Sequence, residues 1–463
     1  MADLRIDNAD WLLTLDRDRR ILRDGAVAVA DGRVIAVGKT DDVAPAHPAP
    51  RVISARGRVV TPGLVDSHIH TTFQMSRGLA DEVGSKRFLF ERMYPYEAAL
   101  DEADALASIR LCVLELLKNG VTTFIDAGNY QPHLTAEVAG AAGLRCVVAR
   151  SSFDVAASAM GVLPPSFIET TEQALERAER VVRELHGAHG GRVHAWLQFR
   201  GLNNSTDRLI VELKRLADIH GVGVQTHACF ARDTRESSLA KHGVTEVERL
   251  ERLGVLDANV LLIHVGWATE AELALLRQHD VKCVAAPSSS LHNAYGNLRE
   301  GHVPELLAAG VAVGLGSDHA SSGIVDLCQE MFLVAGAYKE VRTNPEVLPP
   351  ERVLEMATVH GARCALRGEE IGALEVGRRA DLVLFDTARP EWQPLYNPVA
   401  NLVYSATGRS VDTVIVDGRV LVEGGRALTL DEGAILEEAR RRAPAILART
   451  KLGALVAPKW PVL

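Results

Sequence analysis

The 463-residue sequence predicts an α/β fold, a (β/α)8 barrel with a small β-sandwich domain formed by both termini. Three observations support this prediction: eight short apolar runs in the middle of the chain, helical patterns between several of them, and alternating strand patterns at the two flanks. The predicted boundaries are residues 1–60 and 371–430 for the composite β-sandwich domain, 61–370 for the barrel, and 431–463 for a C-terminal helix and tail.

The eight runs are short, rich in β-branched residues and mostly uninterrupted by polar residues, which is typical of parallel strands covered on both faces. They are the run that ends at His70 and the segments 121–127, 144–150, 192–199, 222–228, 259–265, 281–287 and 311–318. Each is therefore predicted to be one strand of the barrel.

Amphipathic helices are expected between several of these strands. Residues 105–117 place Leu106, Ile109, Val113 and Leu116 three or four positions apart, and similar stripes occupy 170–185 and 206–219. Gly120 follows the first pattern, as glycine often does at the end of a helix. Strand and helix patterns therefore alternate, which is the order of a barrel.

The flanks of the chain show a different pattern. The segments AVAVADGRVIAVG near the N-terminus and VDTVIVDGRVLVEGG near the C-terminus both place alternating strands around an Asp-Gly turn. Residues 371–386 add another strand. Their similarity predicts one β-domain built from both ends, with a charged amphipathic helix over 431–449 outside it.

Composition excludes several classes of function. The net charge is −9, from 51 Lys+Arg and 60 Asp+Glu, so no overall positive field would attract a nucleic acid. The six cysteines are scattered without CxxC spacing, which favours reduced, buried thiols. The chain has neither a signal-peptide pattern nor an apolar run of membrane-spanning length. We expect a cytoplasmic protein with a small-molecule substrate and no nucleic-acid or membrane partner.

Four histidines and one aspartate occur at the ends of four predicted strands. His68 and His70 lie two positions apart and therefore project from the same face of the first strand. His227, His264 and Asp318 follow at the ends of the fifth, sixth and eighth strands. Two histidines alone could equally be half-buried and bonded to carbonyl groups, but all five at one rim favour a metal site.

The chemistry of these side chains indicates the kind of metal and reaction. His68, His70, His227 and Asp318 together offer nitrogen and oxygen ligands with room for water. We expect one divalent metal ion, Zn²⁺ by default, with Fe²⁺ or Mn²⁺ as alternatives. Such an ion lowers the pKa of its water and supplies hydroxide near neutral pH, which implies hydrolysis.

Several separate motifs resemble one family of enzymes. They are PGLVDSHIH at 62–70, QMSRGLADE at 74–82, LELLKNGVTTFIDAG at 114–128, SDHASSG at 317–323 and EIGALEVGRRADLVLFD at 370–386. Together they resemble the amidohydrolase superfamily, in the branch of cytosine-deaminase-like and triazine-hydrolase-like enzymes.

The resemblance implies a role for each residue of the predicted site. It implies a single metal on His68, His70, His227 and Asp318. Asp318 would also take the proton of the attacking water, and His264 would hydrogen-bond that water or the tetrahedral oxygen. Gln198 stands on the fourth strand, where binuclear relatives would need a lysine, and this supports one metal.

The sequence departs from the resemblance after His227. Ring deaminases of this branch place a proton-shuttling glutamate three residues later, where this chain has Phe230. In one interpretation Asp233, Glu236 or His319 replaces that acid, and the enzyme deaminates a nitrogen-rich ring. In the other, the substrate needs no protonated ring nitrogen, as with an N-substituted amide, urea or carbamate. Displacement of a triazine substituent lies between the two.

The sequence therefore favours a metal-dependent hydrolase that uses metal-bound hydroxide to cleave a C–N bond of a small nitrogen-rich molecule. The alternatives are a deaminase of a purine, pyrimidine or triazine ring that releases ammonia, and a barrel that binds without catalysis. We expect four residues to contact the substrate: His319, Ser288, Gln74 and Phe230. For His319, a supporting role behind the substrate-contacting residues is an equal alternative. We expect Phe73, Met75, Phe88 and Phe90 to form an apolar wall, and the protein to be a homo-oligomer.

Overall fold

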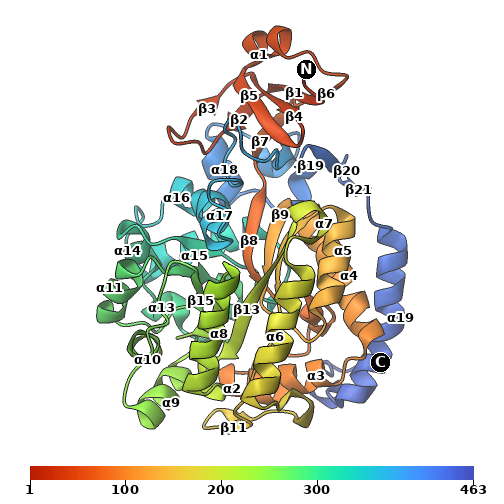
Figure 1. Cartoon of the computed structure of the whole chain (residues 1–463). Helices are drawn as coiled ribbons and strands as arrows, with labels where there is room; N and C mark the ends of the chain where they lie inside the picture. The colour runs from red at the N-terminus through yellow and green to blue at the C-terminus, as the bar shows by residue number, and fades with distance from the viewer. Residues whose placement is uncertain (463) are drawn as a thin grey trace.

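A computed structural model describes residues 1–462 and contains a closed barrel of eight parallel strands (Figure 1). In chain order the strands are β8 (Leu64–Ile69), β9 (Val121–Asp126), β10 (Arg145–Ala149), β13 (Val193–Gly201), β14 (Val224–Ala228), β15 (Val260–His264), β16 (Lys282–Ala285) and β17 (Val313–Leu315). Neighbours in the chain are neighbours in the sheet. The predicted (β/α)8 barrel is confirmed.

The barrel closes where its last strand meets its first. The Asp318 N–H donates to the His68 carbonyl at 2.8 Å, and the His70 N–H donates to the Asp318 carbonyl at 2.7 Å. These two bonds make a parallel bridge between Ile69 and Asp318. Because closure runs through these residues, the ends of β8 and β17 are fixed against each other.

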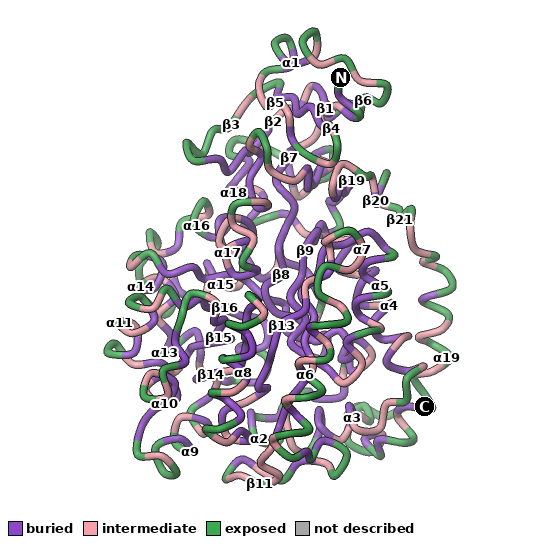
Figure 2. Tube along the Cα trace, in the orientation of Figure 1, coloured by how far each residue is buried: buried purple, intermediate pink, exposed green. Residues whose placement is uncertain are grey.

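The helices surround the strands, which are almost entirely buried (Figure 2). The longest around the barrel are α4 (Glu102–Lys118), α6 (Thr171–Leu185), α8 (Asp207–His220) and α15 (Leu327–Arg342). The first begins at a capping box, in which Asp101 and Asp104 each accept the other's backbone N–H. These helices cover the predicted segments 105–117, 170–185 and 206–219.

Two further sheets lie at one end of the barrel, the first built from N-terminal strands and the second from strands of both termini (Figure 1). One sheet has the order β5-β4-β1-β6, from Arg33–Lys39, Gly25–Ala30, Leu4–Ala9 and Arg51–Ser54. The other has the order β21-β20-β19-β18-β7-β2-β3, from Arg426–Ala427, Arg419–Glu423, Val411–Val416, Leu382–Asp386, Arg58–Pro62, Trp11–Leu13 and Ile21–Leu22. N-terminal β7 pairs with C-terminal β18, so the additional β-structure joins both ends of the chain.

The two Asp-Gly turns form the predicted hairpins. Asp31 and Gly32 connect β4 with β5, and Asp417 and Gly418 connect β19 with β20. All four residues have positive φ, from 47° to 72°, as a two-residue type I′ turn requires.

A buried ion-pair cluster joins the barrel to the terminal sheets. Arg145 on β10 is 1% exposed, and its Nη2 lies 2.9 Å from Asp417 Oδ1 and 3.4 Å from Asp381 Oδ2. On the outside, α19 (Glu432–Thr450) packs along α4 and forms ion pairs with it, including Lys118 Nζ to Glu432 Oε2 at 2.6 Å.

Short segments cover the carboxyl end of the barrel, opposite the terminal sheets (Figure 1). They are η1 (Thr71–Ser76), α2 (Ser85–Arg87), η2 (Phe88–Met93), α3 (Tyr94–Ala98) and the hairpin of β11 (Ala157–Ser158) and β12 (Gly161–Val162). They enclose the space above the strand ends, where the polar residues predicted from the sequence lie. None of the helices in residues 1–462 has the length and apolar character needed to cross a membrane.

Candidate metal centre

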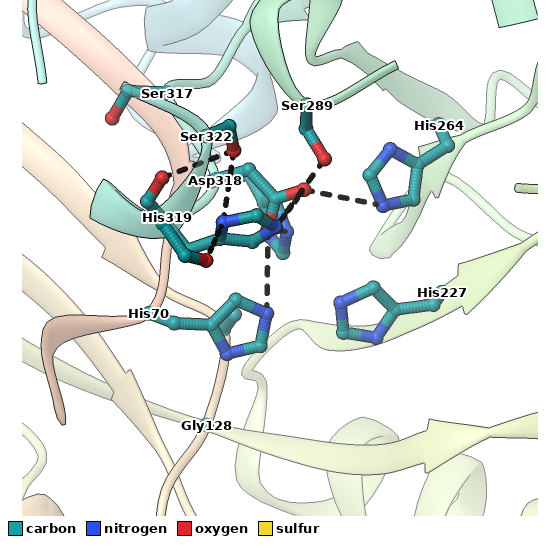
Figure 3. Close-up of polar contacts among 12 residues, drawn as sticks. His70, Gly128, His227, His264, Ser289, Ser317, Asp318, His319 and Ser322 are labelled. Carbon is teal, nitrogen blue, oxygen red and sulfur yellow. Dashed lines mark hydrogen bonds and ion pairs between the residues drawn. The ribbon is translucent and has the colours of Figure 1, made fainter. Parts of the chain in front are cut away.

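The carboxyl ends of four strands bring five predicted side chains into one cluster (Figure 3). His68 belongs to β8 and His70 follows it directly; His227 and His264 belong to β14 and β15, and Asp318 follows β17. All are buried except His227, which is half-buried. The rings of His70, His227 and His264 surround the Asp318 carboxylate.

Distances within the cluster allow a shared cation. Asp318 Oδ1 lies 3.1 Å from His68 Nε2 and 3.5 Å from His70 Nε2, and Asp318 Oδ2 lies 3.8 Å from His264 Nε2. Donor atoms lie within 4.8 Å of one another in two overlapping triads. The triads are His68, His70 and His227, and His68, His264 and Asp318.

Burial disfavours the cationic form of three imidazoles of the cluster, those of His70, His227 and His264. Burial lowers the pKa of His70 and His227 well below the ordinary value, and lowers the pKa of His264 to about 3. Burial alone would raise the pKa of Asp318, but the neighbouring imidazoles of His319 and His68 lower it well below its usual range. A carboxylate among imidazole nitrogens is a donor set that suits a divalent metal.

One hydrogen bond fixes which nitrogen of His227 faces the cluster. Its Nδ1 lies 2.7 Å from the backbone carbonyl of Arg200, which can only accept, so Nδ1 carries the proton. The Nε2 lone pair is therefore available to bind a metal ion, as is usual for metal-binding histidines whose other ring nitrogen donates to a backbone carbonyl.

The backbone around the cluster is held in strained conformations. His264, Val265 and Asp318 have φ of 78°, 52° and 61°, a region that costs non-glycine residues about 1–3 kcal/mol each. Gly316 permits the close approach of the chain after β17 to β8. A Cβ at this position would lie 2.7 Å from His68 Cβ and 2.8 Å from the His68 carbonyl oxygen, too close for any side chain. Closure of the barrel stabilises this geometry.

A cavity opens above the cluster and has a largely aromatic wall. It encloses about 670 Å³ of empty space, including its open mouth. The aromatic side chains that line it are Phe73, Phe88, Phe90, Tyr94, Phe230 and Tyr295. Its polar lining comprises four residues of the cluster, all except His68, together with Arg200, Asn203, Asn204, Thr234 and His319. Such a cavity suits a small molecule with an extensive apolar surface.

Two of the four predicted substrate residues line this cavity and two do not. Phe230 and His319 are in its wall. Gln74 is buried on η1 and its amide donates to Glu115, so its side chain is turned away. Ser288 is buried outside the lining, in the first turn of α12 (Pro287–His292). Of the predicted apolar wall, Phe73, Phe88 and Phe90 line the cavity, whereas Met75 packs in the adjacent hydrophobic cluster.

Of the three residues considered as replacements for the missing acid, two lie outside the cavity and one lines it. Asp233 accepts hydrogen bonds from Ser85 Oγ at 2.7 Å, and Glu236 pairs with Arg232 on the exposed face of α9 (Arg232–His242). Neither lines the cavity. Among these three candidates only His319 faces it.

His319 is held in place on all sides (Figure 3). Its Nδ1 lies 2.6 Å from Ser321 Oγ and 2.8 Å from Ser322 Oγ, and its Nε2 lies 3.4 Å from Ser289 Oγ. Its ring stacks on Phe88 with centroids 4.7 Å apart. The side chain is therefore pre-positioned beside Asp318.

Sequence reasoning missed Arg200 and Tyr295 as residues of the site. Arg200 stands two positions after Gln198 on β13, so it lies on the same face of that strand nearer its carboxyl end. That spacing was a usable signal. Tyr295 lies in the loop after α12, where no periodicity indicates its direction.

Comparison with known proteins identifies the family. A model of the amidohydrolase family matches residues 59–421. The chain belongs to the amidohydrolase family. This confirms the resemblance described from the motifs and the enzyme class predicted from it, a hydrolase that acts on carbon–nitrogen bonds of small molecules.

Individual members of the amidohydrolase family match nearly the whole chain. A 5'-deoxyadenosine deaminase of Methanosarcina acetivorans is 34% identical over 97% of this chain and 99% of its own. An adenosine deaminase from Xanthomonas campestris, solved with bound zinc, is 26% identical with a TM-score of 0.89 over 96% of this chain and 99% of its own. A triazine hydrolase variant is 25% identical with a TM-score of 0.88 over 95% of this chain and 99% of its own.

Proposed function

We propose that this amidohydrolase cleaves a C–N bond of a small, largely apolar molecule with one divalent metal ion, zinc by default, held by His68, His70, His227 and Asp318. The observation that carries the proposal is the convergence of these donors beneath an aromatic cavity: donor atoms of the three histidines lie within 4.8 Å of one another, and Asp318 Oδ1 lies 3.1 Å and 3.5 Å from His68 Nε2 and His70 Nε2. A bound divalent cation lowers the pKa of a coordinated water toward neutrality and so provides the nucleophile.

The protein's own residues carry the proton transfers. Asp318 is ionised and accepts the proton of the attacking water on a carboxylate oxygen. His264 is neutral, and its Nε2 lies 3.8 Å from Asp318 Oδ2, so it can donate a hydrogen bond to the oxygen that becomes negative at the attacked carbon. Asp318 then returns its proton to the departing nitrogen.

The lining of the cavity favours substrates with a basic leaving nitrogen. Asp318 is the one carboxylate that lines it among residues 1–462, and Phe230 stands where a second acid would be needed. The Phe230 ring lies 5.7 Å from that of His264 and 5.5 Å from that of Tyr295, so it occupies the wall beside the cluster. An N-substituted amide, urea, carbamate or triazine-like compound needs no further acid.

A second function is supported by a separate observation. The relative from M. acetivorans, 34% identical over 97% of the chain, is named as a deaminase of an adenine nucleoside. His319 lines the cavity beside Asp318 and would donate the ring proton in such a reaction. Deamination of an aminated ring is therefore the alternative.

A product assay separates these functions. The purified protein, loaded in turn with Zn²⁺, Fe²⁺ and Mn²⁺, is incubated with adenine nucleosides, aminated pyrimidines, chlorinated triazines, N-aryl amides, ureas and carbamates. We expect release of a substituted amine, fastest with Zn²⁺. Ammonia release from the nucleosides as the main activity would favour the deaminase. Absence of metal binding altogether would contradict the proposal.

We further infer a homo-oligomeric enzyme of the cytoplasm that binds neither nucleic acid nor membranes. The net charge of −9 and six free, buried cysteines support the compartment and the absence of a polyanionic partner. Light scattering on the purified protein measures the oligomeric state, and a monomer at micromolar concentration would contradict this inference.

A further inference from the structure

Arg200 places a buried cation in the wall of the cavity. It lies near the end of β13 and is 4% exposed. Its Nη1 donates to Glu97 Oε2 at 2.5 Å and to Ser151 Oγ at 3.3 Å. Its Nε and Nη2 donate to no other residue between 1 and 462. Spare donors therefore face the cavity that Arg200 lines.

Aromatic rings separate this guanidinium from the metal cluster. Its Cζ lies 5.4 Å from the ring centroids of Phe73 and Tyr94. The Phe73 ring in turn stacks on His70 with centroids 4.8 Å apart. The Arg200 guanidinium is thus separated from the metal cluster by about the width of one aromatic ring. A flat apolar group that lies along Phe73 would extend from the cluster to the guanidinium.

The charge of the Arg200 and Glu97 pair indicates which acceptor the spare donors suit. Glu97 is 7% exposed and already neutralises the guanidinium. A second carboxylate would leave an uncompensated negative charge in a desolvated wall, which is costly. A neutral carbonyl oxygen adds no charge and satisfies the free N–H groups. The pair is therefore suited to an uncharged oxygen acceptor.

We propose that Arg200 forms an acceptor subsite, and that the substrate carries a carbonyl oxygen on the portion beyond Phe73, away from the scissile C–N bond. The position of the scissile bond in this proposal rests on the proposed function. The substrate class becomes an aromatic or heteroaromatic molecule with a cleavable C–N bond at one end and an oxo group at the other.

Paired ligands that differ in that oxygen test the subsite without turnover. Para-acetylaniline and para-ethylaniline have the same ring and amine, and only the first has a carbonyl. We expect calorimetry on the zinc-loaded protein to show about 10- to 100-fold tighter binding of the acetyl compound, the range for a hydrogen bond to a charged group. Arg200→Met should reduce this preference to about twofold or less.

Controls separate a contact with the ligand from a structural role. The backbone carbonyl that His227 uses remains in Arg200→Met, so its metal content should stay at the wild-type value. Arg200→Lys keeps a positive charge beside Glu97 but loses the planar set of guanidinium N–H donors. It should lose most of the preference for the acetyl compound while remaining folded. Arg145→Lys alters another buried arginine pair, far from the cavity lining, and should keep the full preference.

Two results would overturn the subsite: no preference for the acetyl compound in the wild type, or the same preference in Arg200→Met and Arg200→Lys. Should Arg200→Met fail to fold, the lysine variant decides. Hydrolysis of the corresponding acetanilides is measured separately. Tighter binding of the acetyl compound without any C–N hydrolysis would support the subsite and contradict the proposed function, so the two failures are distinguishable.

Discussion

His264 could be either a metal ligand or a hydrogen-bond donor, and its distances from Asp318 favour the second role. Its Nε2 lies 3.8 Å from Asp318 Oδ2, compared with 3.1 Å and 3.5 Å from Oδ1 for the same atoms of His68 and His70. It also belongs to a triad whose donors lie within 4.8 Å. Our proposal gives it the donor role, and His264→Asn tests that choice.

The expected effect is on turnover. Removing one preorganised donor to a developing oxyanion costs about 10²- to 10³-fold in kcat, or about 2.7–4 kcal/mol of transition-state stabilisation. No hydrogen bond to the protein is lost, since His264 Nδ1 has no partner among residues 1–462. Folding should therefore be little affected, and the four remaining donors should still bind one metal ion.

The assay combines kinetics with metal analysis on the same sample. Turnover is measured with the best substrate of the panel, and bound metal by plasma mass spectrometry. We expect kcat to fall by at least about 100-fold, with KM little changed and one metal ion per chain. If the variant loses its metal together with its activity, His264 is a ligand and the assignment of roles is wrong.

Three further predictions concern the metal ligands and the fold. His227→Ala should lose most of its bound metal under the same analysis, and full retention would remove it from the proposed ligand set. Arg145→Ala leaves the buried Asp381 without its ion-pair partner and should lower the free energy of unfolding by about 3–5 kcal/mol in urea; a loss below about 1 kcal/mol would contradict the importance of this junction. Burial raises the pKa of Glu330 to about 8, so the folded protein keeps a proton that the unfolded chain loses above its ordinary value of 4.5. Unfolding free energy should therefore fall from about pH 5 to 8, and Glu330→Gln should flatten this slope; an unchanged slope would refute it.

Much of the barrel could be predicted from sequence because its signals are local. Each strand is a continuous apolar run, and the Asp-Gly turns specify their hairpins through the positive φ that both residues adopt. The rim residues could be predicted for a related reason. In a barrel of eight parallel strands, the residues at the carboxyl ends of the strands share one edge. His68, His227 and Asp318 therefore lie together independently of the conformations of the loops.

The rest of the site depends on packing that no local pattern specifies. Gln74 follows His70 closely in sequence, yet the turn of η1 directs its amide to Glu115 and out of the cavity. Arg200 becomes part of the wall because Glu97, far away in the chain, holds its guanidinium. Tyr295 likewise reaches the cavity from a loop. Such long-range contacts decide which side chains of a covering segment face inward.

The central claim is that one divalent cation binds where five strand-end side chains converge. Its most direct test is a calorimetric titration of Zn²⁺ into chelator-treated protein, with the His68→Ala, His70→Ala double variant as the control. We predict one tight site per chain in the wild type and none in the variant. Absence of a stoichiometric site in the wild type, or equal binding by the variant, would contradict the claim.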